Sequence, residues 1–200
     1  MTRSSLYPIS PLSSPASSLL RRFRRSRDGA TAVEFGIVAM PFFAFLMGVL
    51  ELALSFWSTQ VLETAVANAS RQIYTGQFQQ DPNNAGLTSA QLQAKFKTLV
   101  CNNVQALFRC NNLVSVDVRR VANFNDANLA APINTQTQQY DPSGYGYNPP
   151  GRLELAVVRA SLEYPVYVTR MGYINVGGGT GLASGNRLIV ASAVFRTEPY

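Results

Sequence analysis

RDGATAVEF at residues 27–35 continues directly into GIVAMPFFAFLMGVLELALSFW at residues 36–57, and these two stretches decide the fold. Between Glu34 and Glu51 the segment has no charged residue. Because a helix needs about 20 largely apolar residues to cross a bilayer, residues 30–57 are predicted to form a transmembrane helix. A buried core helix is the alternative, but bulky apolar side chains on every face of one helix favour a membrane.

An arginine cluster precedes this helix. Residues 1–28 hold six arginines and one acid. Five of the arginines lie close to the helix: Arg21, Arg22, Arg24, Arg25 and Arg27. Because basic residues that flank a span stay in the cytoplasm, we predict a single-pass protein with a cytoplasmic N-terminus. The Ser- and Pro-rich residues before the cluster are predicted to be disordered.

A cleavable signal peptide is the alternative for the same segment, and the pair Arg21–Arg22 would also suit a twin-arginine export signal. Such signals have an apolar core of about 7–15 residues that ends at a small-residue cleavage site. Here the apolar segment is longer and the helical pattern continues beyond it. A retained membrane helix therefore fits the sequence better.

The composition argues against most familiar catalysis. The chain of 200 residues has no histidine and two cysteines, too few for Ser-His-Asp or Cys-His pairs, for His-containing metal sites or for Cys₄ sites. The net charge of +6 would suggest a nucleic-acid ligand, but most of it lies in residues 1–28, and the rest of the chain carries 11 basic and 10 acidic side chains. We therefore expect no cofactor, no metal and no nucleic-acid partner.

Glu34 is an unusual residue at the start of an apolar helix. A lone acid at the bilayer centre costs about 2.5–3.5 kcal/mol, so Glu34 either lies at the interface or has a partner. If the chain is cut after Gly29, Ala30 becomes a new amino terminus and Glu34 lies one turn further on, where the helix dipole favours negative charge. Glu34 would then be able to pair with the terminal ammonium group of a neighbouring subunit. The alternative is that Gly29 is only a flexible hinge and Glu34 an interface residue.

The spacing of Gly29, Ala30, Glu34 and Phe35 before a long apolar helix resembles the processing site of type IV prepilins. With Pro41 a little further on, the string resembles the TadE-like pseudopilins of the tight-adherence (Flp) pilus system. The resemblance implies that a prepilin peptidase cuts after Gly29 and that Glu34 guides assembly.

The resemblance covers residues 27–75 well and residues 76–186 weakly. The last residues, AVFRTEPY at 193–200, are similar to the strand and Glu-Pro-aromatic ending of that family. Thr197 stands where those proteins frequently have Asn.

For function, the resemblance implies a non-enzymatic minor pseudopilin that aids assembly of a tight-adherence pilus. Its expected place is the bacterial inner membrane, with a cytoplasmic N-terminus and a periplasmic C-terminal domain, and it either stays there or is transferred to the pilus. Its expected partners are the prepilin peptidase, other pilin and pseudopilin subunits, the pilus assembly machinery and membrane lipid. The alternative is a signal-anchored periplasmic binding protein or enzyme without a pilus role.

Beyond Trp57 the helical period continues with an apolar stripe on one face only. The stripe consists of Val61, Leu62, Ala65, Val66, Ala69 and Ile73, and Gly76 provides a stop. We therefore predict an α+β protein with four parts. They are a basic leader that is removed (1–29), a transmembrane helix (30–57), its amphipathic continuation (58–76) and a small extracytoplasmic domain (77–200).

The outer domain is predicted to contain a second helix and about three antiparallel strands. Residues 88–91, TSAQ, form a capping-box pattern, and Leu92, Phe96, Leu99 and Val100 follow as an apolar stripe. Alternating residues predict strands at 113–121, 152–168 and 187–196. Pro165 indicates that the second strand is either in two pieces or at an edge.

Cys101 and Cys110 lie on the side of the membrane that the arginines predict to be oxidising. A structural disulfide is favoured, and it would contribute about 2–4 kcal/mol. A redox-active pair is the alternative, although the spacing is not that of a Cys-x-x-Cys motif.

Two loops complete the sequence. Residues 123–151 form a long polar loop that is either functional or loosely ordered, and its Tyr140, Tyr145 and Tyr147 are of a residue type enriched at interfaces. Residues 177–181, GGGTG, lack the Gly-Lys-Ser/Thr ending of a phosphate-binding loop, so we interpret them as a hairpin connection. The acidic residues occur singly, and no carboxylate pair for hydrolysis is evident.

Overall fold

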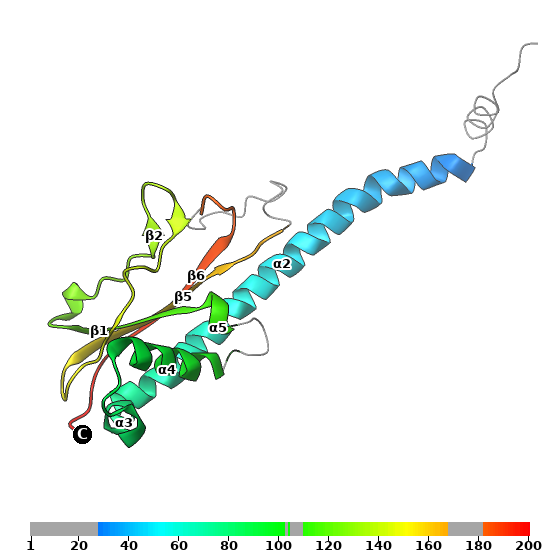
Figure 1. The fold of residues 1–200 in the computed structure, drawn as a ribbon. Helices are drawn as coiled ribbons and strands as arrows, with labels where there is room; N and C mark the ends of the chain where they lie inside the picture. The colour runs from blue at the N-terminus through cyan, green and yellow to red at the C-terminus, as the bar shows by residue number, and fades with distance from the viewer. Residues whose placement is uncertain (1–27, 103, 105–109, 168–181) are drawn as a thin grey trace, which may run out of the picture. The chain divides into compact units, whose positions relative to one another are not determined.

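The computed structural model describes residues 28–102, 104, 110–167 and 182–200 (Figure 1). Most of the basic leader and the glycine-rich segment 177–181 lie outside the described residues. The chain divides into two compact units, residues 1–46 and 47–200. Helix α2, Asp28–Tyr74, contributes to both units.

Helix α2 begins two residues before the predicted start at Ala30 and ends at Tyr74. It continues through Pro41 without a break. Gly76 ends it as predicted: its φ of 77° is in the left-handed region, and its N–H donates to the Ile73 carbonyl oxygen at 3.1 Å.

The second unit adds short helices and one longer helix after α2. The elements are α3 (Gln77–Gln80), the 3₁₀ turn η1 (Pro82–Asn84), α4 (Ser89–Asn102) and α5 (Cys110–Leu113). The capping box before α4 forms as predicted: the Thr88 N–H donates to Gln91 Oε1 at 2.9 Å and the Gln91 N–H to Thr88 Oγ1 at 3.4 Å.

The main sheet has four strands in the order β4-β1-β5-β6 (Figure 1). They are β1 (Ser115–Val121), β4 (Tyr147–Asn148), β5 (Leu155–Tyr164) and β6 (Arg187–Arg196). Strands β1, β5 and β6 pair antiparallel, whereas β4 pairs parallel to β1. A two-stranded hairpin, β2 (Ile133–Asn134) and β3 (Gln139–Tyr140), and the turn η2 (Phe124–Asp126) lie between β1 and β4.

Two predicted strand boundaries are wrong. The second predicted strand is neither split nor at an edge, because β5 pairs with β1 on one side and β6 on the other. It ends at Tyr164, directly before Pro165, which accounts for the proline. The first strand begins at Ser115 instead of residue 113, because Cys110–Leu113 forms a helical turn in which the Val114 N–H donates to the Cys110 carbonyl oxygen at 3.0 Å.

The core lies between one face of the sheet and the helices. The predicted stripe of α2 is buried there, with Leu62, Ala65 and Ile73 at 0 % exposure. Helix α4 adds Phe96 and Val100, and the sheet adds Val118, Val158, Leu162 and Ile189 among others. Because burial of apolar area is the main favourable term in folding, this stripe fixes the amphipathic half of α2 to the domain.

The long loop after β1 is packed on the domain, and one of its three tyrosines, Tyr147, is a core residue and not an interface residue. Tyr147 is 6 % exposed, and its ring lies 5.8 Å from that of Phe78 and 6.4 Å from that of Phe96. Burial raises the pKa of the Tyr147 phenol above its ordinary value. Tyr140 bonds to Ser161 of β5, with its hydroxyl 3.1 Å from the backbone carbonyl oxygen and 3.0 Å from Oγ.

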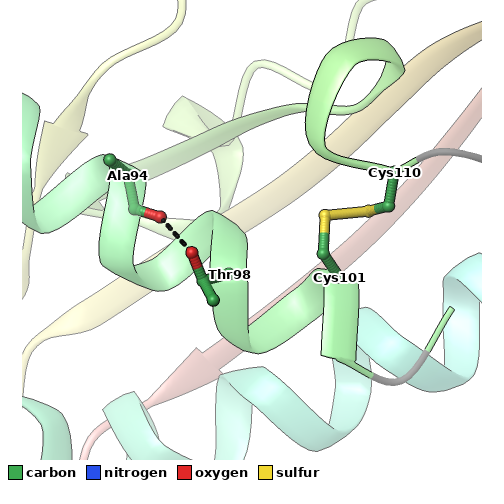
Figure 2. Close-up of a disulfide and its surroundings, with 4 residues drawn as sticks. All are labelled: Ala94, Thr98, Cys101 and Cys110. Atoms are coloured by element: carbon green, nitrogen blue, oxygen red, sulfur yellow. Dashed lines mark hydrogen bonds between the residues drawn. A yellow bond between two sulfur atoms is a disulfide. The ribbon is translucent and has the colours of Figure 1, made fainter. Parts of the chain in front are cut away.

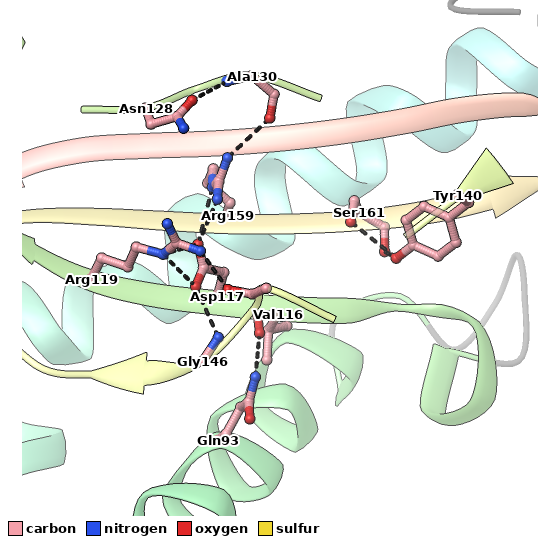
Figure 3. A network of polar contacts seen from close by, with 11 residues as sticks. Gln93, Val116, Asp117, Arg119, Asn128, Ala130, Tyr140, Gly146, Arg159 and Ser161 are labelled. Carbon is pink, nitrogen blue, oxygen red and sulfur yellow. Dashed lines mark hydrogen bonds and ion pairs between the residues drawn. The ribbon is translucent and has the colours of Figure 1, made fainter. Parts of the chain in front are cut away.

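A buried ion pair joins this loop to the sheet (Figure 3). Asp117 of β1 is fully buried and accepts hydrogen bonds from Arg159 at 2.8 Å, from Arg119 at 2.9 Å and from the Gly146 N–H at 3.0 Å. Arg159 also donates to the Ala130 carbonyl oxygen at 3.1 Å. Both charges are therefore well satisfied, and the network connects β1, β5 and two points of the loop.

We predict that Asp117→Ala lowers the free energy of unfolding by about 3–5 kcal/mol, because it leaves the Arg159 guanidinium buried without its counter-charge. Chemical denaturation of the full chain in detergent micelles measures the change. The control is Arg120→Ala, which removes the exposed pair with Glu154 (3.3 Å) and should cost less than about 1 kcal/mol. Equal losses in the two variants would contradict the structural role of the buried pair.

Candidate functional site

The residues of the predicted processing site all lie in the first turns of α2. Gly29 is half-buried, and Ala30, Glu34 and Phe35 are exposed. Residues four apart lie on one face of a helix, so Ala30 and Glu34 share a face and are separated by about 6 Å along the helix axis. A terminal amino group created at Ala30 would thus lie on the same face as the Glu34 carboxylate.

The apolar half of α2 exposes bulky side chains on all its faces. The exposed residues are Val33, Phe35, Ile37, Val38, Met40, Phe42, Phe43, Phe45, Leu46, Met47, Val49, Leu50, Leu54, Phe56 and Trp57. The helix is long and apolar enough to cross a membrane, and only 11 % of its most apolar stretch of 18 residues is buried. The alternative of a core helix does not hold, because such a helix would be mostly buried. A patch this large indicates lipid or other helices as its environment.

The change from all-round exposure to packing begins near Ser55. Ser55 and Ser58 are each 1 % exposed, and Arg187 Nη1 donates to Ser55 Oγ at 2.5 Å. One turn earlier, the Glu51 carboxylate accepts the Tyr167 backbone N–H. Sequence reasoning missed both contacts, since they join residues more than 100 positions apart and neither residue type is distinctive on its own.

The C-terminal residues fasten the end of α2. The Glu198 N–H donates to the Tyr74 carbonyl oxygen at 3.0 Å, so the tail satisfies one of the carbonyl groups that a helix end leaves unpaired. The Tyr74 ring meets the Phe195 ring edge-on at 6.0 Å. The Tyr200 ring lies directly against Gly76, where a Cβ atom would overlap it. Burial raises the pKa of the Tyr200 phenol, an effect that the Arg152 guanidinium partly offsets.

Thr197 differs from the Asn that is frequent at this position in the resembled family, but its hydroxyl both donates and accepts a hydrogen bond. It is 2 % exposed, its hydroxyl donates to the Gly151 carbonyl oxygen at 2.6 Å, and that hydroxyl accepts the Glu154 N–H at 3.1 Å. The ending was singled out from the sequence only by resemblance. Its contacts give it a structural role, which is to join the end of β6 to the start of β5.

The predicted disulfide between Cys101 and Cys110 is formed (Figure 2). The two Cα atoms are 5.4 Å apart, and the bond connects the end of α4 to the start of α5. Both residues are buried, at 2 % and 4 % exposure. Because reactive cysteines are usually partly exposed, this burial favours the structural disulfide over the redox-active pair.

The acidic residues of the outer domain serve structural contacts. Asp117 lies in the buried ion pair, Glu154 accepts the Gly151 N–H at 2.6 Å, and Glu163 accepts from Ser184 and Asn186 at 2.5 and 2.8 Å. Among the described residues, no group of three or more metal-binding side chains occurs. The residues with a distinctive arrangement are therefore those of α2 and of the tail that fastens it.

We predict that Gly76→Ala destabilises the domain more than Gly86→Ala. Both glycines have positive φ, at 77° and 76°, so each substitution carries a similar backbone cost of about 1 kcal/mol. Only at Gly76 does the new methyl group displace the Tyr200 ring, whereas Gly86 has open space. Free energies of unfolding of the two variants measure the difference, and equal values would show that the tail contact is unimportant.

One comparison with known proteins gives a result. The family model described as TadE-like protein matches residues 29–71, which begins at the predicted processing glycine and covers α2 almost to its end. No curated protein and no solved structure is significantly similar to the chain. Residues 29–71 of the chain are thus similar to the TadE-like family, which the motif around Gly29 and Glu34 also resembles.

Proposed function

We propose that this chain is a minor pseudopilin of a tight-adherence pilus. It is a non-catalytic subunit, anchored in the bacterial inner membrane by α2, with its second unit in the periplasm. A prepilin peptidase removes residues 1–29, and the mature subunit begins at Ala30. The observation that carries the proposal is the TadE-like match over 29–71, on a helix whose first half is exposed on every face.

The two halves of α2 suit the two tasks of such a subunit. The bulky apolar side chains between Val33 and Leu50 are exposed, so they are available to lipid first and to the helices of other subunits later. The amphipathic half carries the outer domain through the Leu62–Ile73 stripe and the tail. A helix built in this way connects a folded domain to an assembly made of helices.

Glu34 supplies the specificity in this mechanism. In an apolar bundle an unpaired carboxylate is costly, and the most favourable partner is an ammonium group at the same depth. The new amino terminus at Ala30 of a neighbouring subunit is such a group. Pairing between subunits would then set their axial register, because only one offset satisfies both charges.

The first test is the mature N-terminus. We predict that the full chain, expressed with its own peptidase and extracted from membranes, begins at Ala30 in N-terminal sequencing. Gly29→Leu should leave the protein at its unprocessed length, because the peptidase motif requires the glycine. A chain that begins at Met1, or at a residue other than Ala30, would contradict processing and favour the signal-anchored alternative.

The second test separates Glu34 from acids elsewhere on α2. We predict that Glu34→Ala leaves membrane insertion and processing intact but lowers the yield of assembled pili about tenfold or more, as expected for the loss of an ion pair in an apolar environment. The matched control is Glu63→Ala, which changes an exposed acid that accepts a hydrogen bond from Gln60 Nε2 at 3.2 Å. Normal piliation in the Glu34 variant would exclude the paired-terminus mechanism.

A further inference from the structure

The outer strand of the sheet has an open side. In the part of the chain that the structure describes, β5 pairs with a strand on each side, whereas β6 pairs with β5 alone. All ten residues of β6 are in register with β5, from Leu155 opposite Arg196 to Tyr164 opposite Arg187. The side of β6 away from β5 is therefore a complete strand edge.

The register shows which backbone groups face this edge. Thr197 follows the last residue of β6 and Glu154 precedes the first residue of β5, and the Thr197 N–H donates to the Glu154 carbonyl oxygen at 2.9 Å. In an antiparallel sheet, the backbone N–H and C=O groups of successive residues point alternately to the two sides of the strand. Because Thr197 bonds toward β5, residues 187, 189, 191, 193 and 195 also bond to β5. The N–H and C=O groups of residues 188, 190, 192, 194 and 196 therefore point to the open side.

Among the described residues, nothing gives this edge the usual protection against other strands. Natural edge strands are blunted by Lys, Pro, bulges or a short length. Residues 188–195, LIVASAVF, contain no charge and no proline, and the ladder to β5 is regular over the full ten residues. Ser192 is exposed, and Val190 and Val194 are partly exposed. Such an edge is a template for one further strand.

Strand β6 and the second half of α2 point in the same direction. Arg187 contacts Ser55 near the start of that half, and Phe195 contacts Tyr74 at its end. The helix rises about 28 Å from Ser55 to Tyr74. The strand rises about 27 Å from Arg187 to Phe195, so the helix and the strand lie alongside each other between these two contacts. Subunits whose helices are parallel in one membrane would then present β6 in one common direction.

The geometry of a pair of β6 strands disfavours a second copy as the occupant. An antiparallel pair would reverse one of the two helices. In a parallel pair, a residue whose N–H and C=O groups face the partner lies opposite a residue whose groups face away, so no residue lies opposite its own copy and the pair has no two-fold symmetry. The arginines at the two ends of β6, Arg187 and Arg196, favour a complementary strand with acids near these positions, since opposite charges across a strand pair are stabilising.

We propose that the open edge of β6 binds a β-strand of a different membrane-anchored subunit of the same assembly. That strand is apolar in its middle and has acidic side chains opposite Arg187 and Arg196. The proposal rests on the proposed function for the nature of the partner. It adds a second, periplasmic contact to the one that α2 makes in the membrane.

The first experiment identifies the occupant. A photoreactive benzoylphenylalanine is placed at Ser192 in the full chain, in a bacterium that assembles the pilus, with the exposed Thr98 of α4 as the control position. We expect a crosslink from position 192 only, and mass spectrometry of the joined peptide should give an apolar segment flanked by acids from another membrane-anchored subunit. A crosslink to a second copy of this chain, to a helical or basic segment, or no crosslink, would overturn the proposal.

The second experiment tests the backbone. Ser192→Pro removes an N–H that faces the open side and spares the bonds to β5, whereas Ser192→Ala keeps that N–H. We expect the proline variant to recover about tenfold less of the identified partner, and the alanine variant to match the unmodified chain. Ala191→Pro removes a bond to β5 and should lower the unfolding midpoint, which verifies the assignment of the two sides.

The outcomes separate this proposal from the proposed function. If Ser192→Pro folds, with an unchanged unfolding midpoint, and recovers the partner normally, the edge is not the binding site, even if Glu34→Ala still abolishes piliation. If the mature N-terminus is not Ala30 while the position-192 crosslink persists, the function is wrong and the edge contact stands on its own.

Discussion

The packing of a one-sided apolar stripe on α2 against the sheet is the interaction on which the rest of the second unit depends. Leu62, Ala65 and Ile73 have no exposed surface, and the residues that cover them come from α4 and from strands far along the chain. A helix with apolar residues on all sides has no preferred orientation, whereas a stripe selects one face. The switch from one pattern to the other, near Ser55, therefore determines where the domain attaches and which part of the helix is left for other partners.

Features governed by near neighbours were predictable from the sequence. The capping box at Thr88 and Gln91, the stop at Gly76 and strand β6 each depend on residues a few positions apart, and each forms where expected. The α2 stripe was predictable for the same reason, because its period is a local property. The disulfide joins cysteines only nine positions apart, so the pairing was also predictable.

Features governed by register and distant contacts were not predictable. Asp117 lies in an alternating strand and would be expected to point toward solvent, yet it is buried because Arg159 is its direct cross-strand neighbour. Pro165 predicts a strand that is either in two pieces or at an edge, but β5 is an interior strand that ends directly before this proline. The tyrosines of the long loop resembled interface residues, and burial of Tyr147 depends on Phe78 and Phe96 from other elements. Within the candidate site, the positions of Gly29 and Glu34 followed from the motif, while the tail that fastens α2 did not.

The position of β6 in the chain has a consequence for biogenesis. The stripe on α2 is synthesised early, but Ile189, Ala191 and the tail that meet it follow more than 100 residues later. Contacts of such long sequence separation form slowly, so the stripe on residues 62–73 stays exposed until β6 has been synthesised. During that interval the nascent chain resembles a chaperone client more than a finished protein, and any delay in the synthesis or folding of residues 187–200 lengthens it.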